Sequence, residues 1–222
     1  PLLNTLLAAE PATVAATLFH ELAHRQYYLP GDTPFNEGFA SFVEQEGLRR
    51  WLSFRRDSAG LCALERRAAR ERAVLALLDG LRAELAAIYG GTGDASARRA
   101  AKARAVGTAR ERYRQLRAGW PEPPWFDRWF GVGPDGAPLP VADGEPPLPN
   151  NASLAALASY AEWVPAFAAL LAEERGDLPA FYARVAELGA LADEARAARL
   201  AALAAVGEDL SAAPPGGSCR SG

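Results

Sequence analysis

The sequence predicts a mainly α-helical fold. Apolar residues recur at helical spacing through most of the 222 residues, with arginine, glutamate and alanine at the intervening positions. No segment alternates apolar and polar residues in the way that is typical of a half-buried strand. Because half of the residues are hydrophobic, the chain can bury one core. We therefore expect a single helical domain over residues 1–206 and a disordered tail over 207–222.

The first two helices are expected near the amino-terminal end. One begins at about Pro11, whose missing N–H costs nothing in a first turn, and continues to Tyr28. The stretch Leu-Pro-Gly-Asp at 29–32 then turns the chain. Thr33 is the predicted N-cap of a second helix, which continues towards Trp51. A turn this short folds the second helix back beside the first.

A long antiparallel helical hairpin is predicted next. Apolar residues recur at helical spacing from Leu61 to Ile88, and a glycine-rich stretch then stops that helix. Ser96 can cap the following helix, whose apolar stripe reaches Leu116. Residues 49–117 carry seventeen basic and seven acidic side chains. This charge fits the solvated face of paired helices, and the alternative is a surface that binds an anionic membrane or nucleic acid.

Residues 118–150 are rich in proline, glycine and tryptophan. A loop of this length is uncommon in a compact domain unless it has a function, such as forming the wall of a substrate cleft. The alternative is that its aromatic side chains pin it to the surface. After this loop we expect a helix that is kinked or split at Pro165, and a last helix from Asp177 to about Val206.

His20-Glu21-Leu22-Ala23-His24 is an H-E-x-x-H sequence on the first predicted helix. Residues four apart lie on one helix face, so both imidazoles can reach one metal ion, and two neutral ring nitrogens suit zinc. Glu21 is placed to act as the general base that takes a proton from water. His20 and His24 are the only two histidines of the chain. The alternative interpretation is a pair of core histidines that neighbouring groups satisfy.

A catalytic zinc site also needs a third protein ligand, and Glu37 is the candidate. It lies thirteen residues after His24, in the first turn of the second predicted helix, and Gly38 leaves room beside it. Asp32 and Glu44 are alternative ligands. Glu37 would otherwise serve only to stabilise the positive end of the helix dipole.

Two supporting roles have candidates as well. Asn36 or Glu44 can orient a ligand histidine through its second ring nitrogen. The oxyanion that develops during peptide hydrolysis needs a donor, and Tyr160 is the catalytic candidate for that role. Tyr27 and Tyr28 are alternatives because they follow the first helix directly. Core packing is the competing explanation for Tyr160.

Residues 18–24 (Leu-Phe-His-Glu-Leu-Ala-His) and 31–44 (Gly-Asp-Thr-Pro-Phe-Asn-Glu-Gly-Phe-Ala-Ser-Phe-Val-Glu) resemble the bacterial family of predicted aminopeptidases. That family belongs to the zincin-type zinc metallopeptidases with a glutamate third ligand. Residues 1–5 and 150–182 match its pattern as well. The resemblance implies one Zn²⁺ per chain, with the two histidines and Glu37 as ligands and Glu21 as the base.

The resemblance also implies that the first two helices form a zincin-like active-site helix pair. It further implies that the family's N-terminal, sheet-containing part of the fold is missing from this chain. Family members often carry a lipoprotein signal, which implies a lipid-anchored, periplasmic location in the bacterial envelope. The chain departs from the related pattern N-E-x-x-S-D, because Ala40 replaces the serine and Ser41 replaces the aspartate.

We therefore expect a zinc metallopeptidase, in the family's terms an aminopeptidase, that acts on a peptide or protein substrate. No nucleic-acid partner is expected. Two alternatives are an inactive module that zinc stabilises, and a helical interaction module that binds an anionic surface through its basic hairpin. The sequence leaves the cleavage preference and the oligomeric state open.

Overall fold

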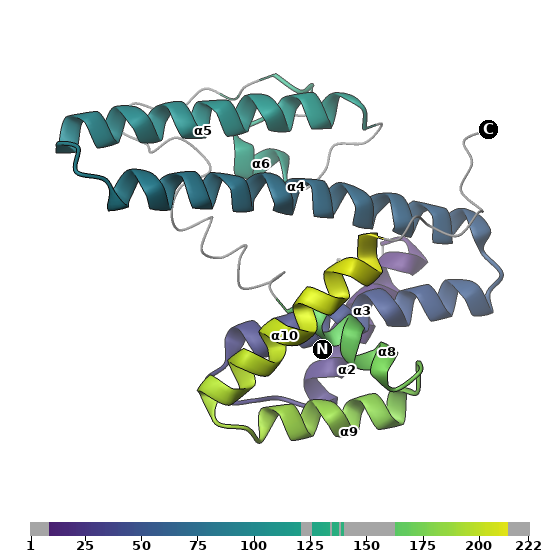
Figure 1. Cartoon of the computed structure of the whole chain (residues 1–222). Helices are drawn as coiled ribbons and strands as arrows, with labels where there is room; N and C mark the ends of the chain where they lie inside the picture. Colours follow the sequence, from purple (N-terminus) through teal and green to yellow (C-terminus); the bar gives the residue numbers. More distant parts are fainter. Residues whose placement is uncertain (1–8, 121–125, 134, 138, 140–162, 213–222) are drawn as a thin grey trace. The chain divides into compact units, whose positions relative to one another are not determined.

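The computed structural model describes residues 9–120, 126–133, 135–137, 139 and 163–212 (Figure 1). Within these ranges the regular elements are helices, with no strand, which confirms the predicted mainly α fold. None of the described helices combines the length and the apolar character needed to cross a membrane.

The chain divides into two compact units, each with its own core. One comprises residues 1–66 and 158–222, and the other comprises residues 67–157. The grouping of residues 1–206 into a single domain stays a prediction.

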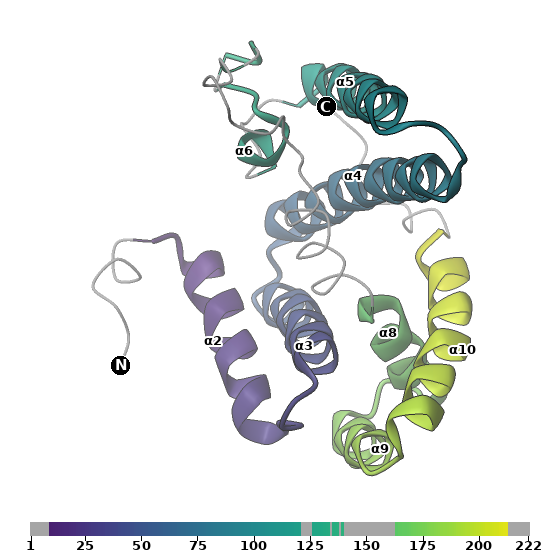
Figure 2. The ribbon, with the colours of Figure 1, turned by 90° about the vertical axis from the view of Figure 1, so that its left-hand side faces the viewer.

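In the first unit, α2 packs along α3, α3 packs on α8, and α8 packs on α10 (Figure 2). The core between these helices is aromatic, and Phe35, Phe39, Phe167 and Phe181 are fully buried in it. Edge-to-face and tilted ring contacts join these side chains. The helices of this unit are α2 (Pro11–Gln26), α3 (Thr33–Phe54), α8 (Val164–Glu173), α9 (Leu178–Gly189) and α10 (Asp193–Ala212).

One boundary of α2 and one of α3 differ from the sequence prediction. α2 ends at Gln26, two residues early, because Tyr27 is extended. The N-cap of α3 is Asp32 rather than Thr33, because the Asp32 carboxylate accepts a hydrogen bond from the Phe35 amide at 3.1 Å.

The predicted last helix is two helices, α9 and α10. Gly189 ends α9, since glycine weakens a helix, and the Arg196 side chain binds the Leu191 carbonyl in the break. The second of these helices also continues past residue 206, to Ala212. Within this continuation, Gly207 lies against the backbone of Pro165 in α8. Pro165 itself lies in the first turn of α8, and residues 140–162 are outside the described part of the chain.

The predicted hairpin is formed by α4 (Ser58–Gly90) and α5 (Ala95–Ala118), and the second unit contains α5 and residues 67–90 of α4. Apolar side chains of the two helices share one core. Asp94, rather than Ser96, is the N-cap of α5 and accepts a hydrogen bond from the Ala97 amide at 2.8 Å.

The short helix α6 (Asp127–Phe130) packs on this hairpin. Phe130 stacks on Tyr113 with ring centroids 4.0 Å apart, and the Tyr113 hydroxyl donates a hydrogen bond to Asp127. Burial and this hydrogen bond raise the pKa of Tyr113. The aromatic side chains of residues 126–132 are therefore packed on the hairpin, as the second of the two expected roles requires.

Candidate metal centre

The antiparallel helices α2 and α3 carry the residues of the predicted zinc site. His20 and His24 lie one turn apart on α2, and Glu37 lies in the first turn of α3. Ala23 and Ala40 are buried at 1% and 0% exposure, and such small side chains let two helix backbones approach closely. The predicted turn at residues 29–32 thus places Glu37 opposite the two histidines.

The three predicted ligands converge. Nε2 of His20 lies 3.3 Å from Nε2 of His24. Nε2 of His20 lies 3.6 Å from Oε2 of Glu37, and Nε2 of His24 lies 3.7 Å from Oε1 of the same carboxylate. Among the described residues, this is the one group of three His, Cys, Asp or Glu side chains that is close enough to hold a metal ion.

The donor set and its spacing fit zinc. Ligand atoms at about 2.1 Å from a tetrahedral zinc ion are about 3.4 Å from one another. The measured separations of 3.3 to 3.7 Å are close to that value. Two imidazole nitrogens and one carboxylate leave a fourth position open, as catalytic zinc sites do. Each of the three side chains is between one fifth and one quarter exposed, so the cluster is open to solvent.

Glu44 orients His20 from the other side of the ring. Nδ1 of His20 lies 3.2 Å from Oε2 of Glu44. An ionised carboxylate can only accept, so Nδ1 carries the hydrogen and Nε2 presents its lone pair to the cluster. The hydrogen bond to Glu44 raises the pKa of His20, against the opposing effect of burial, and the charges of Glu44, Glu37 and Glu21 raise it further.

Asn36, the other predicted orienting residue, has a different role. It is 2% exposed, and its side-chain amide binds the backbone of Leu29 in both directions. Oδ1 of Asn36 accepts from the Leu29 N–H at 2.8 Å, and Nδ2 donates to the Leu29 carbonyl at 2.7 Å. Asn36 therefore closes the turn between α2 and α3.

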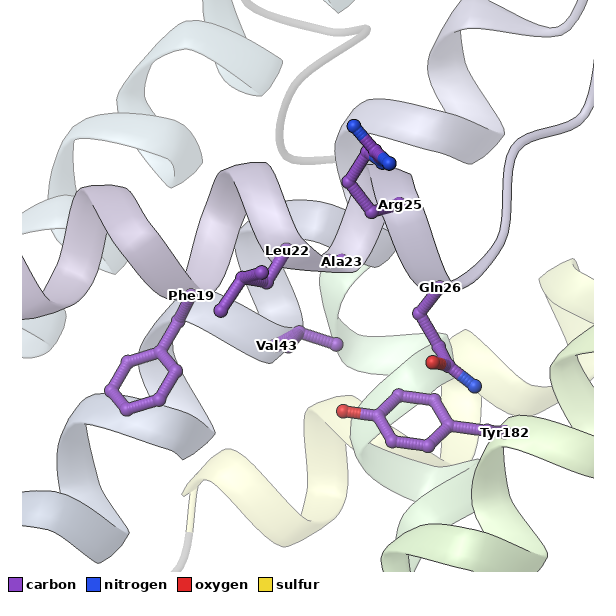
Figure 3. Close-up of a pocket in the computed structure, with 7 residues that line it drawn as sticks. All are labelled: Phe19, Leu22, Ala23, Arg25, Gln26, Val43 and Tyr182. Atoms are coloured by element: carbon purple, nitrogen blue, oxygen red, sulfur yellow. The ribbon is translucent and has the colours of Figure 1, made fainter. Parts of the chain in front are cut away.

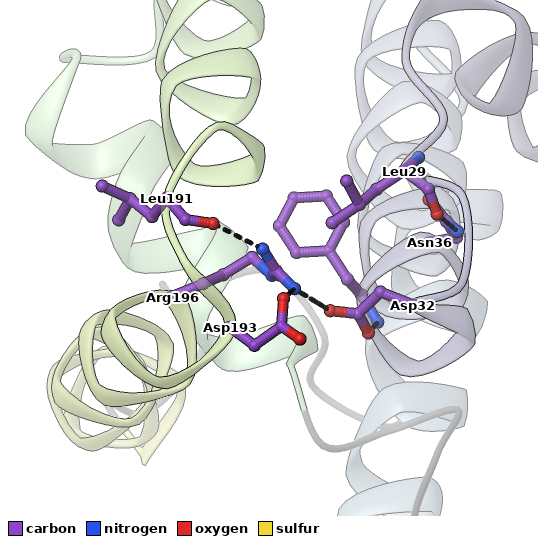
Figure 4. A network of polar contacts seen from close by, with 7 residues as sticks. Leu29, Asp32, Asn36, Leu191, Asp193 and Arg196 are labelled. Atoms are coloured by element: carbon purple, nitrogen blue, oxygen red, sulfur yellow. Dashed lines mark hydrogen bonds and ion pairs between the residues drawn. The ribbon is translucent and has the colours of Figure 1, made fainter.

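Asp32, an alternative ligand in the sequence analysis, lies outside the cluster as well. Its second carboxylate oxygen accepts from Arg196 at 3.0 Å, while Arg196 also binds the Leu191 carbonyl and Asp193 (Figure 4). Arg196 is 5% exposed, so a buried side chain of α10 binds the turn between α2 and α3. Together with Asn36, it fixes the start of α3 and hence the position of Glu37.

Among the described residues, Nδ1 of His24 lacks the kind of hydrogen-bond partner that Glu44 provides for Nδ1 of His20. Nδ1 of His24 is buried and has no hydrogen-bond partner in the described part of the chain. Nothing in the sequence pattern predicted this difference between the two histidines.

Gly38 does more than leave room beside Glu37. A Cβ atom on Gly38 would lie 2.9 Å from Cβ of Trp163 and 3.6 Å from the Phe167 ring. The absent side chain thus lets the start of α8 approach α3 next to Glu37.

The three tyrosines considered as oxyanion donors have different positions relative to the cluster. Tyr160, the first candidate, is outside the described residues. Tyr27 packs against the aromatic core, and its hydroxyl lies against Gly189. Tyr28 is 59% exposed, and its ring meets the ring of His24 edge-on, with centroids 6.2 Å apart.

A pocket of about 360 Å³ lies on another face of α2. None of the cluster residues lines it. As Figure 3 shows, its wall comes from α2, α3 and α9, through Phe19, Leu22, Ala23, Arg25, Gln26, Val43 and Tyr182.

Comparison with known proteins matches the chain to a family model. The family model described as "Putative aminopeptidase" matches residues 1–200. No curated protein and no solved structure matches the chain.

Proposed function

The chain belongs to this aminopeptidase family, and we propose that it is a zinc-dependent peptidase whose metal is held by His20, His24 and Glu37. The family description indicates a peptidase, and the convergence of two imidazole nitrogens and one carboxylate supports the metal-dependent type. That convergence is the observation that carries the proposal. It joins residues of two helices, whereas the H-E-x-x-H spacing concerns one helix only.

Glu21 is the proposed general base. It follows His20 directly in α2 and is exposed to solvent. When bound, zinc supplies Lewis acidity, which polarises a peptide carbonyl and lowers the pKa of water. Glu21 takes a proton from the attacking water and passes it to the nitrogen of the leaving amine. An exposed carboxylate next to a ligand histidine can serve both transfers, since it stays free of the metal.

To act as a zinc ligand through Nε2, His20 needs its hydrogen on Nδ1. Glu44 holds the hydrogen there by accepting it at 3.2 Å, so that Nε2 faces Glu37 and His24. Glu44 thus takes no part in the reaction itself but orients one ligand. The aminopeptidase specificity that the family description names is part of this proposal: the product would be a single residue released from the amino terminus of a peptide.

The test uses the whole chain, loaded with zinc, and the variant Glu21→Gln. We expect wild type to cleave members of a peptide mixture, with the released residues identified by mass spectrometry. The variant should keep its zinc and lose activity by about 10²–10⁴-fold, because only proton transfer is removed.

Chelation should abolish the activity and added zinc should restore it. A zinc-loaded wild-type chain without turnover on any peptide would overturn the catalytic proposal. It would favour a module that zinc merely stabilises. Cleavage at internal bonds alone would retain the peptidase and reject the aminopeptidase specificity.

A further inference from the structure

We propose that Tyr28 is a further catalytic residue, whose hydroxyl donates a hydrogen bond to the carbonyl oxygen of the peptide bond under attack. This inference rests on the proposed peptidase function. The chemistry requires a donor of this kind, because negative charge develops on that oxygen as water adds to the carbonyl. A tyrosine is neutral near pH 7 and keeps its O–H as a donor.

The position of Tyr28 is the first support. Its ring contacts the ring of His24 at an interplanar angle of 70°, with centroids 6.2 Å apart, and 59% of the residue is exposed. An exposed aromatic residue alone is common on protein surfaces. Contact with a candidate ligand places this one at the rim of the cluster, on the side open to solvent, where a substrate has access.

The backbone on both sides of Tyr28 is fixed, which is the second support. The Tyr27 N–H donates to the Ala23 carbonyl at 3.0 Å and ends α2. The next residue, Leu29, is held through both backbone groups by the buried side chain of Asn36. Asn36 directly precedes Glu37, so one buried amide joins the third ligand to the segment that carries Tyr28. Such pre-organisation is what a donor for a developing charge needs.

The other described candidates of the first unit are occupied elsewhere. The Tyr27 hydroxyl lies against Gly189 in the packed interior. Tyr182 packs on the rings of Phe39 and Phe181 and lines the pocket of Figure 3. Arg25 lines that same pocket, away from the cluster. Of these side chains, Tyr28 is the one in contact with a histidine of the cluster.

The test compares Tyr28→Phe with the matched variant Tyr27→Phe, which loses the neighbouring hydroxyl. We expect Tyr28→Phe to lower kcat by about 10²-fold with little change in KM, because the hydrogen bond strengthens as charge develops. Zinc content should stay at the wild-type level. Tyr27→Phe should retain both kcat and zinc.

A second readout is independent of turnover. A phosphonamidate peptide, which mimics the tetrahedral oxyanion, should bind zinc-loaded Tyr28→Phe by calorimetry more weakly than wild type by a similar factor. Unchanged kcat and phosphonamidate affinity, or a loss of zinc in the variant, would overturn the role of Tyr28. The proposed function would fail differently, through a zinc-loaded wild type that cleaves no peptide.

Discussion

Glu44 accepts a hydrogen bond from Nδ1 of His20 at 3.2 Å, across the interface of α2 and α3. The related pattern N-E-x-x-S-D would supply a carboxylate at position 41, where this chain has serine. Glu44 lies three residues further, about one helical turn along α3, and so on a neighbouring part of the same face. The carboxylate that supports the first histidine is therefore present, displaced by one turn.

If the cluster binds zinc as proposed, this pair should make zinc affinity depend on pH. A proton on Nε2 of His20 competes with zinc, and the raised pKa means that His20 holds this proton at a pH above its ordinary 6.5. Zinc affinity should therefore fall about tenfold per pH unit below the raised pKa. Glu44→Gln weakens the hydrogen bond that raises this pKa and removes the charge of Glu44, so the decline should begin at a lower pH. Competitive titration against a chromophoric chelator, from about pH 5 to about pH 8, measures it.

Glu46→Gln is the matched control for this titration. Glu46 lies two residues after Glu44 on α3, but it accepts hydrogen bonds from Arg49 and Arg50. Its loss should leave the pH profile of zinc binding unchanged. Coincident profiles for wild type and Glu44→Gln would contradict the role of Glu44.

Arg196 should stabilise the fold through the turn that carries Asp32. Arg196→Met keeps the apolar stem but leaves Asp32 and the Leu191 carbonyl without this donor. We expect the free energy of unfolding to fall by about 2 kcal/mol, as for hydrogen bonds to charged groups. Urea denaturation followed by circular dichroism measures it.

Arg199→Met provides the comparison, because Arg199 pairs with Glu173 on the surface, where both side chains are about two fifths exposed. The loss of such a pair should cost less than about 1 kcal/mol. Equal losses for the Arg196 and Arg199 variants would show that the buried network contributes nothing beyond a surface ion pair.

Gly207 should be essential for the contact of α10 with α8. A Cβ atom there would lie 1.9 Å from the Pro165 carbonyl oxygen, a backbone atom that cannot turn aside. Gly207→Ala should therefore destabilise the fold by about 1–3 kcal/mol, despite the better helix propensity of alanine. Gly80→Ala, in the interior of α4 with nothing within 4 Å of the new Cβ, should stabilise by up to about 1 kcal/mol. Thermal unfolding of both variants checks the pair, and stabilisation by Gly207→Ala would refute the close approach.

The sequence predicted α2 to α5 and the three converging residues because these depend on local spacing. The H-E-x-x-H pattern requires only that residues 20–24 form a helix, and the short turn brings Glu37 back beside it. The choice between Asn36 and Glu44 was not predictable, because it depends on how α3 is rotated against α2. The buried contact of Asn36 with Leu29 settles that rotation.

Contacts between distant segments had no local signal. Arg196 is 164 residues from Asp32 along the chain, and an arginine within an alanine-rich helix gives no sign of its partner. α10 continues to Ala212, beyond the predicted end near Val206, and Gly207 within it packs against Pro165 of α8. Tertiary packing overrides propensity in such places.

The most direct test of the account is the metal content of the purified, metal-replete protein, measured by plasma mass spectrometry. Wild type, Glu37→Gln and the control Glu46→Gln would be compared, with circular dichroism to show that each is folded. The account predicts about one zinc per chain in wild type and in the control, and most of it lost in Glu37→Gln. Folded wild type without zinc, or Glu37→Gln with its zinc intact, would contradict the three-residue site.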